Sequence, residues 1–274
     1  MSREPAARLR WRDRLALAYA SLRGDRGRLA ERSDAVLRAR AGALERQRRF
    51  VDNASHELRG ALSVIRAEAE VALARPEADR AELRHALAVA LETSKRTHAL
   101  LESLLTLARS QRGQRRRDAP CDLSAVARTA ASLAGAQARA DGIRLHLALA
   151  PAPVRGDSRL LERAAANLVE NAVRYNRHNG SVAVESGCAD GRAWLRVVNS
   201  GPRVAAEEIE RIVEPFERLD GRAEGGGGAG LGLAIVRSVA EAHGGRLALA
   251  PGPAGGLVAE LALPRGDGRT SAAS

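Results

Sequence analysis

The first half of the chain has the hydrophobic spacing of two long helices. Residues 25–75 contain no proline and are dense in Ala, Leu, Arg and Glu, a composition typical of a helix longer than those of most globular domains. Pro76 ends this segment, and a second helix is predicted over residues 77–109. Its small and apolar positions step alternately by four and three residues, which is heptad spacing: Leu83, Leu87, Ala90, Ser94, Thr97, Leu101, Leu104 and Ala108.

Two such helices predict an antiparallel hairpin. One hairpin cannot cover its own apolar faces, because each helix has only a single neighbour. We therefore expect two copies of the chain to pair as a four-helix bundle, which makes the protein a homodimer.

The second half of the chain changes to a mixture of helices and strands. Residues 111–120 (QRGQRRRDAP) form a charged linker with Gly and Pro, which predicts a domain boundary. After the linker come predicted helices over 122–141, 158–175, 207–213 and 231–242, and predicted strands over 143–149, 181–185, 193–198, 246–250 and 257–263. Strands with interspersed helices on one face predict an α+β sandwich.

Composition and charge narrow the function classes. The chain has 43 Arg, one Lys and a net charge of +11, and residues 1–60 hold 15 Arg against 8 acidic residues. This basic segment leaves contact with an anionic membrane surface open, whereas the lack of a helix-turn-helix pattern and an aromatic content of 2% argue against nucleic acid. No segment reaches the roughly 18–20 uncharged apolar residues of a spanning helix, so a cytoplasmic protein is expected. Cys121 and Cys188 form no CxxC pair, which argues against a disulfide framework or a zinc site.

The segment 50–59 (FVDNASHELR) contains the first candidate for chemistry, His56. At about 100° per residue, an apolar stripe runs along this helix through Ala54, Leu58, Ala61 and Ile65. His56 lies opposite the stripe and is predicted to project into solvent, with Glu57 beside it. A neutral imidazole nitrogen can accept a phosphoryl group, and a neighbouring carboxylate can take the ring proton. The alternative is a surface histidine without a function.

Polar side chains recur on one face of the predicted helix over 167–175 (NLVENAVRY). Asn167, Asn171, Arg174 and Tyr175 follow the spacing i, i+4, i+7 and i+8. Two amide oxygens suit Mg²⁺, a guanidinium suits phosphate oxygens, and the tyrosine ring could flank a base. A polar surface with a pair of amides is the alternative interpretation of this segment by itself.

A glycine-rich run over 225–233 (GGGGAGLGL) leads directly into an apolar helix. Glycines permit close backbone approach, and the free N–H groups of a helix N-terminus bind phosphates. No βαβ unit frames the run, which argues against a dinucleotide-binding fold. A flexible linker is the alternative, although a linker is not expected to end in Gly-Leu-Gly-Leu at an apolar helix.

Taken in order, five segments resemble the sequence boxes of bacterial sensor histidine kinases of two-component systems. They are 55–59 (SHELR, the H box), 167–175 (the N box), 199–202 (NSGP, the first glycine box), 214–216 (EPF, the F box) and 228–233 (GAGLGL, the second glycine box). Each motif is weak by itself, but five in this order over residues 44–263 form a specific signal.

The resemblance implies an α+β fold with two principal domains. The N-terminal one is a helical hairpin for dimerisation and phosphotransfer, and the C-terminal one is an α/β sandwich of the Bergerat type, found in GHKL ATPases such as gyrase and heat-shock chaperones. The expected limits are a basic helical segment resembling the end of a HAMP relay (1–43), the dimerisation and histidine phosphotransfer domain (44–110), a linker (111–120), the ATP-binding domain (121–264) and a polar tail (265–274). A HAMP relay normally follows a membrane helix, so the chain is expected to be either a soluble kinase or one whose start lies upstream.

The resemblance also assigns site residues. It makes His56 the phosphoacceptor, Glu57 the general base, and Asn167 and Asn171 the ligands of Mg²⁺. The residues implied to contact the nucleotide are Asn167, Asn171, Arg174, Tyr175, Asn199, Gly201, Phe216, Gly228, Gly230, Leu231, Gly232 and Leu233. The expected cofactors are therefore ATP and Mg²⁺.

Two departures from the family pattern change the expectation. The H box usually continues Arg-Thr-Pro, but here it continues Arg59-Gly60-Ala61. Relatives use the polar side chain four residues after the histidine to position water for dephosphorylation, so kinase activity with weak phosphatase activity is expected. Asn199 stands where the family usually has an Asp that accepts from the adenine 6-amino group. The uncharged amide predicts weaker ATP binding, and Asn199→Asp is expected to tighten it.

The function implied is histidine autophosphorylation. His56 would receive the γ-phosphoryl group of ATP and pass it to an aspartate of a response-regulator receiver domain, with no nucleic-acid partner. Two alternatives use the same fold. One is a catalytically weakened, nucleotide-binding signalling scaffold, and the other is an ATPase or serine kinase, against which His56 counts.

Overall fold

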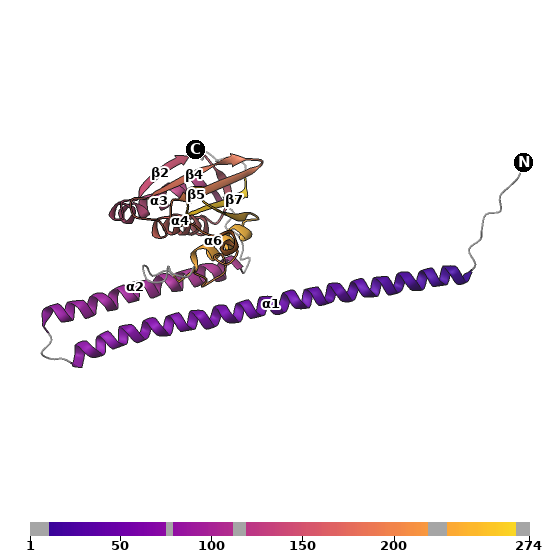
Figure 1. The fold of residues 1–274 in the computed structure, drawn as a ribbon, viewed down its shortest axis with the longest axis horizontal. Coiled ribbons are helices and arrows are strands. Elements are labelled where there is room, and N and C mark those ends of the chain that lie inside the picture. The colour runs from indigo at the N-terminus through magenta and orange to yellow at the C-terminus, as the bar shows by residue number, and fades with distance from the viewer. Residues whose placement is uncertain (1–10, 75–78, 112–118, 219–228, 267–274) are drawn as a thin grey trace, which may run out of the picture. The chain divides into compact units, whose positions relative to one another are not determined.

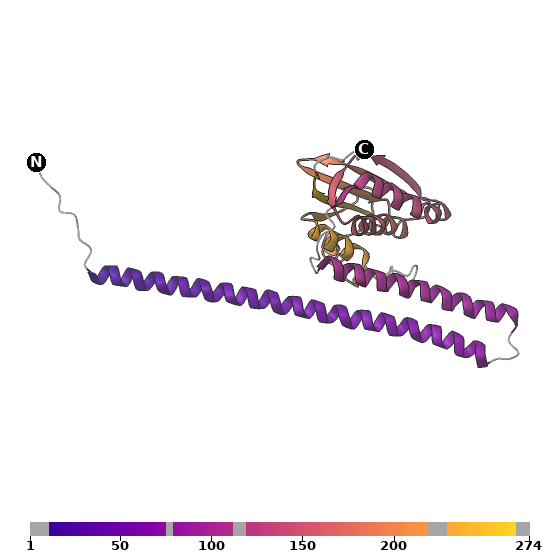
Figure 2. The same ribbon diagram turned by 180° about the vertical axis from the view of Figure 1, so that it is seen from behind.

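The computed structural model describes residues 11–74, 79–111, 119–218 and 229–266 of the chain. Its compact units are Met1–His56 and Glu57–Ser274. One long helix, α1, contributes to both units, and the second unit also holds helix α2 and an α/β sandwich (Figures 1 and 2). This division into two units does not test the domain limits expected from the sequence, which stay a prediction.

Helix α1 spans Trp11–Ala74 and helix α2 spans Arg80–Gln111, and the part of α1 that belongs to the second unit forms the expected helical hairpin with α2. Asp79 caps the start of α2, because its Oδ1 accepts from the backbone N–H groups of Ala81 (2.7 Å) and Glu82 (2.8 Å). The expected break at Pro76 lies outside the described residues. Helix α1 begins earlier than residue 25, since the helical composition of Ala, Leu and Arg already starts at Trp11.

A five-stranded sheet forms the centre of the sandwich. Its strand order is β2-β4-β5-β7-β6, and only the β2–β4 pair is parallel. The strands are β2 (Arg144–Leu149), β4 (Ser181–Ala189), β5 (Arg192–Asn199), β6 (Arg246–Pro251) and β7 (Leu257–Pro264). Helices α3 (Leu123–Ala140), α4 (Ser158–Arg174) and α6 (Gly232–Ala242) lie on one side of the sheet, and the short α5 spans Ala206–Ile209 (Figure 1). The predicted α+β sandwich is confirmed.

The core lies between the sheet and these helices. Alternate residues of β4 and β5 are buried, and Val182, Val184 and Leu195 are fully so, as are Leu161 of α4 and Ile235 of α6. The opposite sheet face is only partly covered. There Arg196 donates to Glu260 (Nη2–Oε2 2.7 Å) and stacks over the ring of Trp194.

A small two-stranded sheet was not predicted from the sequence. Strand β1 (Ala119–Asp122) pairs antiparallel with β3 (Pro153–Gly156), so the C-terminal end of the expected linker is a strand instead. Each strand has four residues and contains a proline, which leaves too few positions for alternation to be visible. Residues 112–118 of the linker and 267–274 of the tail lie outside the described part of the chain.

His243 joins the ends of α4 and α6. It is the C-cap of α6, and it is buried. Its Nδ1 donates to the carbonyl oxygen of Val239 (2.7 Å), while its Nε2 accepts from the N–H of Asp157 (3.1 Å), the N-cap of α4. These roles require the neutral imidazole with its proton on Nδ1.

Among the described residues, no helix combines the length and the apolar character needed to cross a bilayer.

Candidate functional site

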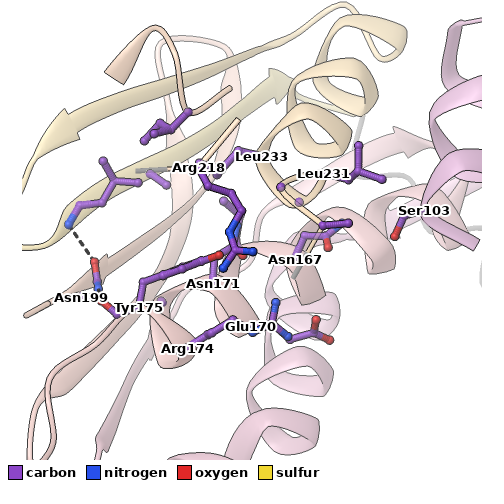
Figure 3. Close-up of a pocket in the computed structure, with 18 of the residues that line it drawn as sticks. Ser103, Asn167, Glu170, Asn171, Arg174, Tyr175, Asn199, Arg218, Leu231 and Leu233 are labelled. Carbon is purple, nitrogen blue, oxygen red and sulfur yellow. Dashed lines mark hydrogen bonds between the residues drawn. The ribbon is translucent and has the colours of Figure 1, made fainter. Parts of the chain in front are cut away.

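Helix α4 is amphipathic, and its polar face carries the candidate residues. Asp157 caps its start by accepting from the N–H groups of Arg159 (3.0 Å) and Leu160 (3.4 Å). The buried face packs into the core through Leu161, Ala164, Ala165, Leu168, Val169, Ala172 and Val173. Burial of this face leaves Asn167, Asn171 and Arg174 on the side that faces a large cavity, as Figure 3 shows.

The cavity has a volume of about 1070 Å³ and lies within the unit Glu57–Ser274. It is lined by α2, by α4, by the adjacent ends of β5 and β7, and by the segment that leads into α6. The polar and charged residues of this lining are Glu92, Lys95, Arg96, Ser103, Gln137, Arg163, Asn167, Glu170, Asn171, Arg174, Tyr175, Asn199, Glu217 and Arg218.

The two amides of α4 are open to a ligand. Asn167 is only 6% exposed, yet its Nδ2 has no hydrogen-bond partner. The amide of Asn171 lies against the backbone of Gly232, where an added Cβ would come within 2.9 Å of Nδ2. A buried donor without a partner costs about 1–3 kcal/mol, so a bound acceptor such as a phosphate oxygen would be stabilised at Asn167 Nδ2.

These residues fit a divalent cation that brings its own phosphate. Amide oxygens are hard ligands, and Mg²⁺ typically takes few protein ligands together with waters and substrate phosphates. Among the described residues, no group of three or more His, Cys, Asp or Glu side chains could hold a metal ion alone. With two amide oxygens, the Asn167–Asn171 pair suits an Mg²⁺ ion that substrate phosphates also hold.

The N-terminus of α6 also lines the cavity, beside the amide of Asn171. Its N-cap, Leu231, makes no side-chain cap, and the first N–H groups of a helix have no intrahelical partner, so within the described part of the chain those of this 11-residue helix lie uncapped at the cavity. The preceding turn is tight, because Gly230 has φ +67° and its carbonyl accepts from the N–H of Phe216 (3.0 Å). Free N–H groups at a helix start are suited to phosphate oxygens.

Tyr175 and Asn199 form the other end of the cavity (Figure 3). Tyr175 is the C-cap of α4, and Asn199 is the last residue of β5. The adjoining loop is fixed by a polar cluster in which Ser200 Oγ accepts from the N–H of Ser181 (2.8 Å) and contacts Asn176 Oδ1 (3.1 Å). Asn176 and Ser200 were not singled out in the sequence, since their role depends on a contact across 24 residues.

Arginines in the cavity were also missed. Arg163 donates to Ser103 Oγ on α2 (3.2 Å), and its Nε is buried without a partner. It lies one helical turn before Asn167, so the i, i+4 spacing could have revealed it. Arg218 extends toward Asn171 in Figure 3. These side chains add positive charge to a cavity that would hold anionic phosphates.

Most of the predicted nucleotide residues meet at this one cavity. Those that line it are Asn167, Asn171, Arg174, Tyr175, Asn199, Gly230, Leu231, Gly232 and Leu233. Gly201 and Phe216 are not part of the lining but touch it: an added Cβ on Gly201 would collide with the Tyr175 carbonyl, and Phe216 bonds to Gly230. Gly228 lies outside the described residues.

His56 and Glu57 lie on α1, and both side chains are exposed. On the opposite side of the helix, Ala54 is buried and Leu58, Ala61 and Ile65 are half-buried, as the apolar stripe predicts. The expected exposure of the imidazole is confirmed.

Two family models match the chain. The His Kinase A (phospho-acceptor) domain matches residues 46–113, and the histidine kinase-, DNA gyrase B- and HSP90-like ATPase matches residues 156–267. The first match contains His56, and the second contains the cavity residues of α4 and α6. The ATPase domain implies that the chain binds ATP.

Curated relatives of greater length align with most of this chain. Sensor protein CutS of Streptomyces coelicolor is 43% identical over 238 residues, which is 86% of this chain and 57% of that protein. Sensor protein kinase PmrB of Pseudomonas aeruginosa is 36% identical over 225 residues (81% and 46%), and the histidine-protein kinase BaeS of Escherichia coli is 32% identical over 221 residues (80% and 47%). The chain thus spans about half the length of these relatives.

Solved structures share the fold. Histidine kinase AdeS of Acinetobacter baumannii is 21% identical, with a TM-score of 0.60 over 77% of this chain and 98% of that chain. Histidine kinase ThkA, in a complex with the response regulator protein TrrA, is 20% identical, with a TM-score of 0.61 over 77% and 60%. With a phosphoacceptor hairpin followed by this ATPase sandwich, the chain belongs to the sensor histidine kinases.

Proposed function

We propose that this chain is an ATP- and Mg²⁺-dependent histidine autokinase that phosphorylates itself on His56. The observation that carries the proposal is an exposed imidazole in the phosphoacceptor domain, on a chain that has a cavity lined by two amides of α4 and by the uncapped N-terminus of α6. The proposed limits of these domains are residues 44–110 and 121–264.

The cavity residues divide the work of holding the nucleotide. The N–H groups at the start of α6, together with Gly230 and Gly232, hold phosphate oxygens, and Arg174 adds positive charge. Asn167 and Asn171 hold Mg²⁺ through their amide oxygens. When bound, the ion offsets negative charge on the phosphates. Tyr175 contacts the nucleotide from the C-terminal end of α4.

The transfer step uses groups on α1. A ring nitrogen of His56 bonds to the γ-phosphorus while the bond from that phosphorus to the bridging oxygen breaks, and ADP leaves with the electron pair. Glu57, next in the chain, takes the proton that the ring loses. An exposed imidazole suits this step, because its nitrogen must reach a nucleotide held elsewhere.

The phosphoryl group then passes to an aspartate on the receiver domain of a response regulator. Support comes from ThkA, a kinase of the same fold that was crystallised with the response regulator TrrA. We place the reaction in the cytoplasm, where ATP is available. Contact of the basic residues 1–60 with a membrane surface stays a prediction.

Acid and alkali stability of the phosphate tests the proposal. Protein incubated with γ-labelled ATP and Mg²⁺ should carry label that is lost in acid and kept in alkali, because a phosphoramidate has that stability. Acid-stable label would indicate a serine kinase. Nucleotide binding without label would favour the signalling scaffold, the alternative that Gly60 and Asn199 suggest.

Gly60 offers a test of phosphatase activity. An added Cβ there would meet no atom within 4 Å, so a side chain fits without displacement. We expect wild-type protein to dephosphorylate its response regulator slowly, and Gly60→Thr to raise the rate at least about tenfold by giving the attacking water a hydroxyl partner. The measurement is loss of label from the phosphorylated regulator.

The matched control for this prediction is Gly60→Ala. Alanine removes the helix penalty of glycine, about 1 kcal/mol, but supplies no hydroxyl. An equal gain from Gly60→Ala, or fast dephosphorylation by wild type, would contradict the role given to position 60.

Homodimerisation is proposed from the apolar surface that the hairpin leaves open. On α2, Leu83, Leu87 and Leu101 of the heptad positions are 38–70% exposed in the single chain. Leu87→Glu should weaken the dimer at least about 100-fold, because the charge would be buried against the second copy. Sedimentation equilibrium measures this.

A second exposed leucine provides the control for the dimer. Leu133 on α3 is 74% exposed, similar to Leu87 at 70%, but it lies outside the hairpin. Leu133→Glu should leave the dimer intact, whereas a monomeric wild type would overturn the proposal.

A further inference from the structure

The side-chain amide of Asn199 joins two backbone segments at the end of the cavity. Its Nδ2 donates to the carbonyl oxygen of Tyr175 (3.1 Å), and its Oδ1 accepts from the N–H of Leu257 (2.8 Å; Figure 3). Asn199 is 6% exposed. It therefore ties the C-terminus of α4 to the start of β7.

The chemistry of the two partners determines which atom of the Asn199 amide is the oxygen and which is the nitrogen. A carbonyl oxygen only accepts and an N–H only donates, so position 199 must supply one donor and one acceptor. The Tyr175 carbonyl also lies at the C-cap of α4, where helix carbonyls lack intrahelical partners and carry partial negative charge. A donor is favourable there, and an anion is not.

Close packing prevents this tie from rearranging. An added Cβ on Gly201 would collide with the Tyr175 carbonyl oxygen and lie 2.7 Å from Asn199 Nδ2. An added Cβ on Gly256 would collide with the backbone carbonyl of Asn199. The two glycines let the three segments approach, so the amide bridges them at a fixed separation.

We propose that Asn199 is a positioning residue whose amide clamps Tyr175 and Leu257 as walls of the nucleotide cavity, and that an ionised carboxylate cannot replace it. The nucleotide part of this inference rests on the proposed function, whereas the clamp exists without a ligand. The expectation that Asn199→Asp tightens ATP binding assumed an amide free to face the base. The two hydrogen bonds reverse that expectation.

The pH dependence of the stability of Asn199→Asp distinguishes an amide that clamps the backbone from an amide that is free to face the base. As a carboxylate, Asp at position 199 would face the Tyr175 carbonyl and the negative end of α4 in a buried place, so its folded-state pKa would rise above the unfolded value. As a neutral acid, it would again have one O–H donor and one acceptor. Stability from a group with a raised pKa is present at low pH and lost as pH rises through the folded pKa.

The first measurement is thermal unfolding of the full chain without nucleotide, from pH 8 to pH 5, for wild type, Asn199→Asp and Asn199→Ala. We expect Asn199→Asp to melt below wild type at pH 8 and to approach it at pH 5. Asn199→Ala loses both hydrogen bonds at every pH, so its deficit in melting temperature should stay constant. A deficit of Asn199→Asp that does not shrink on acidification overturns the clamp.

The second measurement is the affinity for a non-hydrolysable ATP analogue with Mg²⁺. At pH 8, Asn199→Asp should bind about tenfold more weakly than wild type, as expected for loss of one hydrogen bond near a charge, and the ratio should fall toward one at pH 5. Tighter binding by Asn199→Asp at pH 8 overturns the inference. Wild-type protein that binds no nucleotide contradicts the proposed function instead, and the unfolding data still decide the clamp.

Other charged side chains line the same cavity in every variant. They are Glu92, Lys95, Arg96, Arg163, Glu170, Arg174, Glu217 and Arg218. Because they are common to all three proteins, the differences between variants at each pH isolate position 199.

Discussion

Protein with His56→Ala should carry no acid-labile phosphate after incubation with ATP and Mg²⁺, while it binds nucleotide as tightly as wild type. Loss of the imidazole removes the only proposed acceptor, whereas the described residues that line the cavity lie outside α1. His56 is exposed, so its replacement removes no core packing. The measurement combines labelling by γ-labelled ATP with calorimetric titration of an ATP analogue.

His98→Ala is the matched control for this result. His98 is also an exposed histidine on a hairpin helix, α2, and it has no role in the proposed transfer. Its replacement should leave labelling unchanged. Full labelling of His56→Ala protein, or loss of label in His98→Ala alone, would place the acceptor elsewhere.

Asn171→Ala should lower the autophosphorylation rate at least about 100-fold, because it removes one of two amide oxygens proposed to hold Mg²⁺, a contribution of a few kcal/mol to the transition state. The amide lies against Gly232 at the start of α6, where phosphates are proposed to bind. Alanine favours the helix, so α4 should still fold. Initial rates across a Mg²⁺ titration measure the loss.

Glu162→Ala provides a control on the same helix. Glu162 is exposed on α4 and does not line the cavity, so its removal should leave the rate and the Mg²⁺ dependence unchanged. An Asn171→Ala protein with the wild-type rate at every Mg²⁺ concentration would exclude the amide as a ligand.

Local patterns were sufficient for much of the fold and of the candidate site. The helix predicted over 122–141 is α3, and Asp122 caps its start, because its Oδ1 accepts from the N–H of Ser124 (2.9 Å). The 3.6-residue period placed Asn167, Asn171 and Arg174 on one helix face, and all three line the cavity. Such features depend on residues within one or two turns of each other, so the sequence contains them directly.

Other features depended on segments far apart in the chain. The pairing of β1 with β3 joins residues about 35 apart, and neither strand has a visible alternation. Arg163 contacts Ser103 across 60 residues, and His243 bonds to the N–H of Asp157 across 86. Pattern and propensity describe neighbours along the chain, and they do not specify which distant groups will meet.

The sequence by itself determined the order of the domains, the exposure of His56 and the polar face of α4, because helix periodicity and ordered motifs are local properties. Only the tertiary structure decided what Asn199 does. The sequence shows that residue 199 is an asparagine, but the partners of its amide, the Tyr175 carbonyl and the Leu257 N–H, lie 24 and 58 residues away. A hydrogen bond depends on the distance and direction between two groups, and those are set when α4, β5 and β7 pack together.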